Sequence, residues 1–86
     1  MLHTIAIPGA DEYLALPETA DGYIAQIELC QRDGTVRWRV LPPDGGDDAW
    51  TQVRLDGDTA VANSWSCWRV RLALTTGKEL GRVFTK

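Results

Sequence analysis

The residues best suited to chemistry in this chain are aromatic and polar side chains in its second half. Trp65 and Trp68 offer flat apolar rings, and amide and hydroxyl groups lie close to them in the sequence. An aromatic ring beside hydrogen-bonding groups suits a sugar ring or another small polar molecule. We therefore expect a non-enzymatic site for a carbohydrate or small molecule, formed by Trp65, Trp68, Asn63 and Gln52.

Trp65 and Trp68 are not expected to serve that site equally. Residues three apart on a strand point to opposite faces, so one ring is expected to enter the core and leave the other free. Packing in the core or against another subunit is the competing interpretation for every tryptophan of the chain. It is the role that we assign to Trp38 and Trp50.

The other reactive groups form no recognisable catalytic or metal-binding set. His3 is the only histidine of the sequence. Cys30 and Cys67 lack the close spacing of a redox or zinc pair, and we expect both to be reduced and structural, with Cys67 a small core residue. The carboxylates of residues 44–48 lack the ordered spacing of a calcium loop. The sequence predicts no enzyme activity, no cofactor and no metal.

Composition and charge narrow the choice of partners. The 86 residues carry a net charge of −3, which disfavours nucleic acid because binding there depends on neutralising phosphates. No run is long enough to span a membrane and no signal-peptide pattern is present, so the cytoplasm is the expected compartment. Five arginines in strands are expected to be solvated and to pair with carboxylates such as Glu28 and Glu79. They are Arg37, Arg39, Arg69, Arg71 and Arg82.

The elements that must position these residues repeat about 43 residues apart. Ile27-Glu28-Leu29, Asp33-Gly34-Thr35 and Arg39-Val40 align without a gap on Val70-Arg71-Leu72, Thr76-Gly77-Lys78 and Arg82-Val83. Each copy has the pattern of a β-hairpin, because apolar side chains recur at every second position before a glycine-containing turn.

Two more strand candidates precede each hairpin, which gives two antiparallel four-stranded meanders. The predicted strands outside the repeated positions are 2–7, 13–16, 51–55 and 59–65, and the strands that return after the hairpin turns are 36–41 and 79–85. We expect one all-β domain over residues 1–86, with meander 1 in 1–41, an acidic Pro/Gly linker in 42–48 and meander 2 in 49–86. The alternative is a single small β-barrel or β-sandwich.

The second copy resembles a β-propeller blade of the quinoprotein (PQQ-like) repeat type. The resemblance is carried by Ala62-Asn63-Ser64-Trp65, Trp68-Arg69-Val70-Arg71-Leu72 and Thr76-Gly77-Lys78-Glu79-Leu80, and Asp33-Gly34-Thr35-Val36-Arg37-Trp38 resembles the same motif. It implies that a tryptophan just beyond the turn docks against the neighbouring blade. Trp38 stands at that position, whereas the second copy has Gly81. The resemblance does not imply a bound quinone, since such sites draw on a complete propeller.

The length of the chain bears on its assembly. Propellers have roughly four to eight blades, and this chain supplies about two. Open sheet edges and apolar faces invite association, so we expect a homo-oligomer with ligand sites between blades. The alternative function is a protein-interaction or inhibitory scaffold that uses the exposed sheet edges. A small enzyme is the third and weakest hypothesis.

Overall fold

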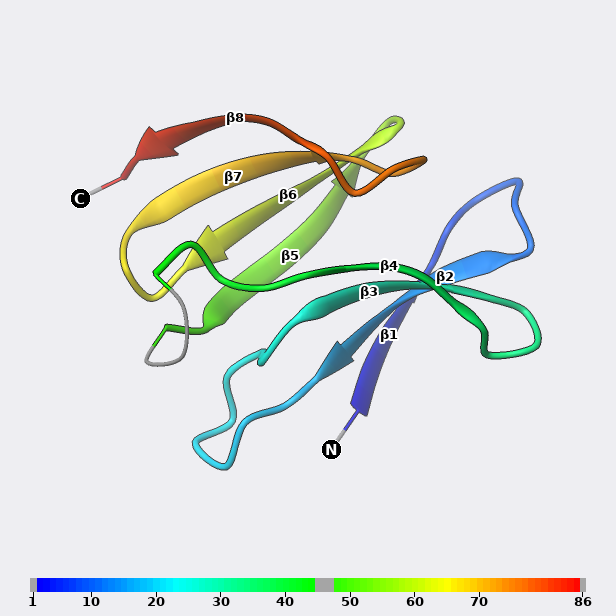
Figure 1. The fold of residues 1–86 in the computed structure, drawn as a ribbon, viewed down its shortest axis with the longest axis horizontal. Helices are drawn as coiled ribbons and strands as arrows, with labels where there is room; N and C mark the ends of the chain where they lie inside the picture. The colour runs from blue at the N-terminus through cyan, green and yellow to red at the C-terminus, as the bar shows by residue number, and fades with distance from the viewer. Residues whose placement is uncertain (1, 45–47, 86) are drawn as a thin grey trace.

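The computed structural model describes residues 2–44 and 48–85 and contains two antiparallel four-stranded sheets (Figure 1). Each sheet is a meander in which neighbours in sequence are neighbours in space. Sheet 1 consists of β1 (Leu2–Ala6), β2 (Glu12–Pro17), β3 (Ile27–Gln31) and β4 (Val36–Val40). Sheet 2 consists of β5 (Trp50–Asp56), β6 (Thr59–Ser64), β7 (Trp68–Ala73) and β8 (Glu79–Phe84). The described residues contain no helix, and neither sheet closes into a barrel.

The prediction of two four-stranded meanders is therefore confirmed. The bounds predicted for six of the strands differ from the observed ones by at most one residue at either end. The predicted strand 59–65, for example, ends at Ser64 because the chain turns at residues 65–67. The acidic linker predicted for residues 42–48 lies partly outside the described chain, at residues 45–47.

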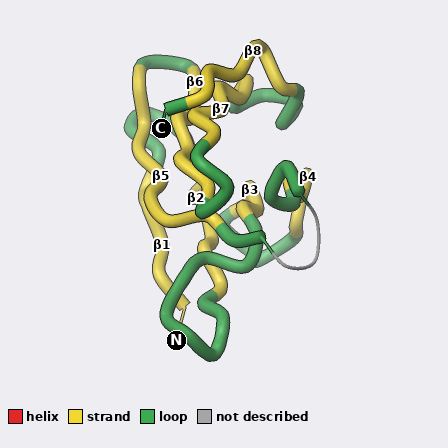
Figure 2. The backbone as a smooth tube through the Cα atoms, turned by 90° about the vertical axis from the view of Figure 1, so that its left-hand side faces the viewer, coloured by secondary structure: helices red, strands yellow, loops and turns green. Residues whose placement is uncertain are grey.

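One hydrophobic core holds the two sheets together. Side chains from both sheets form it: Leu14, Leu16, Ile27, Leu29, Trp50, Ala60, Ala62, Val70, Leu72 and Leu74. Eight of these residues come from every second position of β2, β3, β6 and β7, as expected when one face of a strand is buried. Trp50 is the first residue of β5, and Leu74 directly follows β7. Figure 2 places β1 and β5 on one side of the molecule and β4 and β8 on the other. Each fully buried leucine or valine contributes about 1.5 to 3 kcal/mol to this packing.

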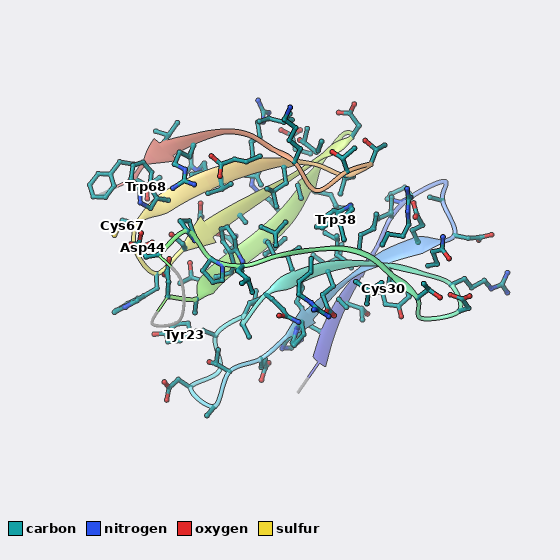
Figure 3. All side chains as sticks on the ribbon, viewed as in Figure 1. Tyr23, Cys30, Trp38, Asp44, Cys67 and Trp68 are labelled. Atoms are coloured by element: carbon teal, nitrogen blue, oxygen red, sulfur yellow. The ribbon has the colours of Figure 1, made fainter. Side chains whose placement is uncertain are left out.

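Two specific contacts also join the sheets. Ile24 and Trp50 exchange a pair of backbone hydrogen bonds of 2.8 Å each. The Trp38 indole nitrogen in β4 donates a hydrogen bond of 2.8 Å to the carbonyl of Leu74 (Figure 3). The Trp38 ring also covers Gly77, where an added Cβ would lie 2.6 Å from ring atom Cδ2. Two constraints therefore require a glycine at position 77: the close contact with the Trp38 ring and the φ of +74°.

The last hairpins of the two sheets differ in register by one residue. In sheet 1, Ile27 lies opposite Val40. In sheet 2, Val70 lies opposite Arg82, although the repeat in the sequence aligns Val40 with Val83. The ungapped alignment of the two copies thus does not extend to the pairing of β8.

The turn before β8 accounts for this shift. Three residues separate Gln31 from Thr35, which close the turn of sheet 1 with a hydrogen bond of 2.8 Å. Four residues separate Ala73 from Lys78, which close the turn of sheet 2 at 2.9 Å. The extra turn residue displaces the whole returning strand, because turn length fixes hairpin register.

A one-residue shift exchanges the faces of a strand. Val83 consequently points away from the core and is 63% exposed, whereas the corresponding Val40 packs against the core. Arg82 lies on the core side, with its guanidinium carbon 5.3 Å from the centre of the Trp68 ring. The slipped strand thus carries Val83 on the outside of sheet 2, and Arg82 and Phe84 on the inside.

Candidate functional site

An aromatic recess lies where the β2–β3 loop of sheet 1 meets the β6–β7 turn of sheet 2. Its volume of about 410 Å³ falls within the range of roughly 300 to 1,000 Å³ that is usual for small-molecule sites. It is lined by Thr19, Ala20, Asp21, Tyr23, Asp48, Ala49 and Trp65. Both sheets contribute to it, so the packing of the two sheets determines its shape.

Two aromatic rings form one wall of the aromatic recess. The ring centroids of Tyr23 and Trp65 are 5.8 Å apart and the ring planes are tilted by 33°. The residues are 39% and 62% exposed, respectively. Two tilted rings with free faces, next to the carboxylate of Asp21 and the hydroxyl of Thr19, provide both stacking and hydrogen-bonding groups for a polar ligand.

A tight loop positions Tyr23. The Thr19 amide donates to the Tyr23 carbonyl at 2.7 Å, and the Tyr23 amide donates to Thr19 Oγ1 at 3.2 Å. The next residue, Ile24, is the one that pairs with Trp50 in β5. The tyrosine is thus held by its own loop and by the backbone of sheet 2.

The carboxylate of Asp48 holds the turn that carries Trp65. Oδ2 accepts hydrogen bonds from Ser66 Oγ at 2.6 Å and from the Asp44 amide at 3.1 Å. Oδ1 accepts from the amides of Ala49 at 2.9 Å and Ser66 at 3.1 Å. Trp65 sits between these anchors, and its own amide donates to the Ala49 carbonyl at 2.7 Å.

These hydrogen bonds also set the charge of Asp48. Partial burial alone would raise the pKa of this carboxyl group, but the hydrogen bonds from Ser66 Oγ and three backbone amides outweigh it and lower the pKa below its usual value. The carboxylate is therefore ionised near neutral pH. Because both of its oxygens are already engaged, Asp48 serves to hold the turn. Asp21 is the carboxylate lining the aromatic recess whose side chain forms no hydrogen bond with the described residues.

The β6–β7 turn corrects two expectations. Trp65 and Trp68 do diverge, but the reason is a turn at residues 65–67 and not the alternation of a strand. Cys67 is not a core residue: it occupies this turn with a φ of 72° and is only half-buried. A left-handed conformation at a residue other than glycine is uncommon and marks a locally constrained turn. Both cysteines are free thiols, and burial raises the pKa of Cys30.

The other predicted ligand-binding residues lie away from the aromatic recess. Trp68 packs on the core side of sheet 2, where its ring meets Phe84 edge to face at a centroid distance of 5.3 Å. Asn63 and Gln52 lie on the opposite face of sheet 2 and share a hydrogen bond of 3.2 Å. The structure thus distributes the four predicted residues over three places, and only Trp65 reaches the aromatic recess.

Tyr23 is the residue that sequence reasoning missed. The signal available was a turn sequence, Thr19-Ala20-Asp21-Gly22-Tyr23, with an aromatic residue at its end. Nothing in that pattern indicates that the turn meets residue 65 of the other sheet.

The two tryptophans assigned to packing both lie between the sheets. Trp50 is 1% exposed and lies within the core, whereas Trp38 is half-buried at the contact with Gly77. The indole nitrogen of Trp50 finds no hydrogen-bond partner within residues 2–44 and 48–85. An unpaired buried donor of this kind costs about 1 to 3 kcal/mol, which the apolar contacts of the ring must offset.

The titratable groups of the described chain form no metal-binding cluster: no three histidine, cysteine or acidic side chains come together there. His3 contacts Glu18, and this hydrogen bond lowers the pKa of the Glu18 carboxyl group. Among the five strand arginines, four form ion pairs: Arg37 with Glu12, Arg39 with Glu28, Arg71 with Asp56 and Arg82 with Glu79. None of the described residues belongs to a helix that could cross a membrane.

Comparisons with known proteins add no identity to this geometry. No family model, curated protein or solved structure matches the chain. The relation to propeller repeats accordingly stays a prediction, and the aromatic recess has to be interpreted from its own residues.

Proposed function

We propose that the protein is a non-enzymatic binding module that takes a carbohydrate or a similar polyhydroxylated small molecule in the aromatic recess. The observation that carries this proposal is the pair of exposed rings, Tyr23 and Trp65, held at a fixed tilt where the two sheets meet. A sugar ring offers apolar C–H groups to an aromatic face and hydroxyl groups to polar neighbours. The rings supply the first surface, and Asp21 and Thr19 supply the second.

Rigidity supports the proposal. The Trp65 turn is held by two hydrogen bonds from Ser66 to Asp48 and by the hydrogen bond from the Trp65 amide to the Ala49 carbonyl. The Tyr23 loop is held by the hydrogen bonds between Thr19 and Tyr23. A site that is already formed loses less conformational entropy when it binds a ligand.

The test is a titration of the protein with a panel of neutral monosaccharides and disaccharides, followed by NMR shifts of the Trp65 indole and by tryptophan fluorescence. Trp65→Ala should weaken binding roughly tenfold or more, because a stacking ring at a site centre dominates affinity. Its melting temperature should change little, because the side chain is mostly exposed.

Two controls separate binding from folding. Tyr23→Phe keeps the ring and should keep most of the affinity, whereas Trp68→Phe alters a tryptophan outside the aromatic recess and should leave affinity unchanged. Shifts that appear at Trp68 instead of Trp65, or no shifts for any sugar, would refute the assignment.

A second candidate, a scaffold that associates through its sheet edges, is favoured by β8. All six of its residues are exposed, among them Leu80, Val83 and Phe84, and only one of its sides is paired. An unpaired apolar edge is a template for another strand, and the partner that we propose is β8 of a second copy. Light scattering after size exclusion over a dilution series should then give a dimer; a monomer at all concentrations would exclude this candidate.

A further inference from the structure

The outer face of sheet 2 carries a second feature, which the aromatic recess does not use. Residues directly opposite each other share a face, so Arg54, Val61, Arg71 and Gly81 form one row across this face. Gln52, Asn63, Arg69 and Val83 form the next row. A hollow of about 350 Å³ lies over the two rows and is lined by Arg54, Asp56, Val61, Arg69, Arg71, Leu80, Gly81, Arg82 and Val83. We call it the arginine hollow.

Positive charge in the arginine hollow is compensated only in part. Arg82 is paired with Glu79 by two hydrogen bonds, of 2.9 and 2.8 Å, but the other three arginines are held less tightly. The guanidinium group of Arg54 forms neither an ion pair nor a hydrogen bond with the residues that the structure describes. Within the described part of the chain, the guanidinium group of Arg69 has one partner, the neutral amide oxygen of Asn63 at 3.4 Å. Arg71 pairs with Asp56 at 3.2 Å, and both side chains of that pair are more than half exposed. An ion pair with this exposure is weak and easily exchanged for another anion.

The excess positive charge lies in the second half of the chain, which forms sheet 2. Residues 1–41 carry six acidic and three basic side chains, whereas residues 50–86 carry three acidic and six basic ones. An acidic protein that gathers unpaired guanidinium groups on one face attracts anions to that face, since the local field and not the net charge acts on a ligand at contact.

The floor of the arginine hollow is open because of the slipped register. Gly81 faces outward opposite Arg71, and a Cβ added at Gly81 would meet no atom within 4 Å. The apolar side chains of Leu80 and Val83 border this space. A ligand can therefore approach the guanidinium groups from the sheet surface without displacing a side chain.

We propose that the arginine hollow binds a small multivalent oxyanion, a di- or tricarboxylate or an organic phosphate with two phosphoryl groups. The spacing of the arginines along and across the strands determines this class of ligand. Arg69 and Arg71 are two residues apart on one strand, about 7 Å, and Arg54 lies two strands away from Arg71, about 10 Å. A monovalent anion would meet one guanidinium group at a time, whereas a multivalent one bridges two or three. Guanidinium groups bind carboxylate and phosphoryl oxygens in pairs, so either chemistry satisfies the site.

The test is calorimetric titration of the intact protein with citrate and with tripolyphosphate in low-salt buffer. Acetate and inorganic phosphate serve as the ligands of lower valence. The multivalent ions should bind with one site per chain, and the lower-valence ions at least about tenfold more weakly. Tighter binding of citrate assigns the carboxylate class, and tighter binding of tripolyphosphate assigns the phosphate class. Equal binding of ions of all valences, or no binding, would overturn the proposal.

Two variants locate the bound ion. Arg71→Ala should weaken binding at least about tenfold. Gly81→Val should fold normally, because its side chain enters open space and valine favours strands, yet it should weaken binding by filling the floor.

Lys78→Ala provides the charge-matched control. It removes one positive charge from the β7–β8 turn without touching the lining of the arginine hollow. It should leave affinity within about twofold of the parent protein, since an exposed charge outside the hollow is largely screened. A loss as large as that of Arg71→Ala would show diffuse attraction to a basic surface and would refute a defined site.

Discussion

The β3–β4 and β7–β8 hairpins start from related sequences and end as different surfaces. In sheet 1 the strand after the turn brings Trp38 toward the other sheet and Val40 against the core. In sheet 2 the corresponding positions, Gly81 and Val83, point away from the core. Sequence similarity of two hairpins thus does not guarantee that equivalent residues share an environment.

Turn length is the origin of this difference. The turn of sheet 1 has Asp33 accepting the Thr35 amide at 2.9 Å, and the turn of sheet 2 has Thr76 accepting the Lys78 amide at 3.2 Å. The local hydrogen bond is thus equivalent in both turns, but one more residue is enclosed in the second. Two hairpins can thus share the same turn hydrogen bond although the two faces of the returning strand are exchanged in one of them.

The largest expected effect on stability comes from removing the Trp38 ring, which has no counterpart in sheet 2. Trp38→Ala should lower the free energy of unfolding by about 3 kcal/mol, because it removes a half-buried indole and leaves the Leu74 carbonyl without its donor. Denaturant melts give this value. A change below about 1 kcal/mol would mean that the ring contributes little to joining the sheets.

The next effect distinguishes the two turn glycines. Gly77→Ala should cost about 2 kcal/mol or more, because the new Cβ meets the Trp38 ring and the residue has a positive φ. Gly34 occupies the corresponding place in sheet 1 with a φ of +91° and has no atom within 4 Å of an added Cβ. Gly34→Ala should therefore cost only about 1 kcal/mol, the conformational part alone. Equal costs in thermal melts would argue against contact between Gly77 and Trp38.

A smaller effect on stability is expected when a tryptophan is placed in sheet 2 at position 81, which corresponds to Trp38. Gly81→Trp should change stability by less than about 1 kcal/mol, because residue 81 faces outward and a ring there cannot reach the core. Nuclear Overhauser contacts from the new indole should involve Arg71 or Val83. Contacts from that indole to Leu72, with a clear gain in stability, would show that the register of β8 is not slipped.

The smallest effect concerns pH and distinguishes the two turns. The backbone and side-chain hydrogen bonds of Thr35 lower the pKa of Asp33 below its usual value. A carboxyl group whose pKa is lower in the folded state stabilises the fold above its unfolded pKa, and the contribution is lost as the pH falls through the folded pKa. The Thr35 amide resonance should therefore move below about pH 4, following Asp33, while Lys78 shows no matching step because Thr76 does not titrate. Identical titration curves at the two amides would remove this distinction.

The sequence predicted the strands well because their alternation is local. Val70 and Leu72 on one side and Arg69 and Arg71 on the other specify both the strand and its buried face. The ungapped repeat was also correct as an alignment, but register depends on where the turn closes, and Leu74 to Gly77 give no sign of the extra residue.

The candidate site was less accessible to prediction for a different reason. The aromatic recess joins Tyr23 and Trp65, which lie 42 positions apart in different sheets. Their meeting depends on how two sheets pack, which no local pattern encodes. Trp65 and Trp68 were expected to diverge by strand alternation, and the turn containing Cys67 separates them instead.

The hydrogen bonds between Ile24 and Trp50 make two amide protons sensitive to any separation of the sheets. Each amide proton is shielded by the backbone of the opposite sheet, and neither can exchange with solvent deuterium while the sheets stay together. Their exchange rates therefore measure how often the two sheets separate. Rates that match the slowest amides of β3 and β7 would mean that the halves separate only when the whole chain unfolds. Faster rates would identify a partly open state in which both sheets survive and the aromatic recess is split in two.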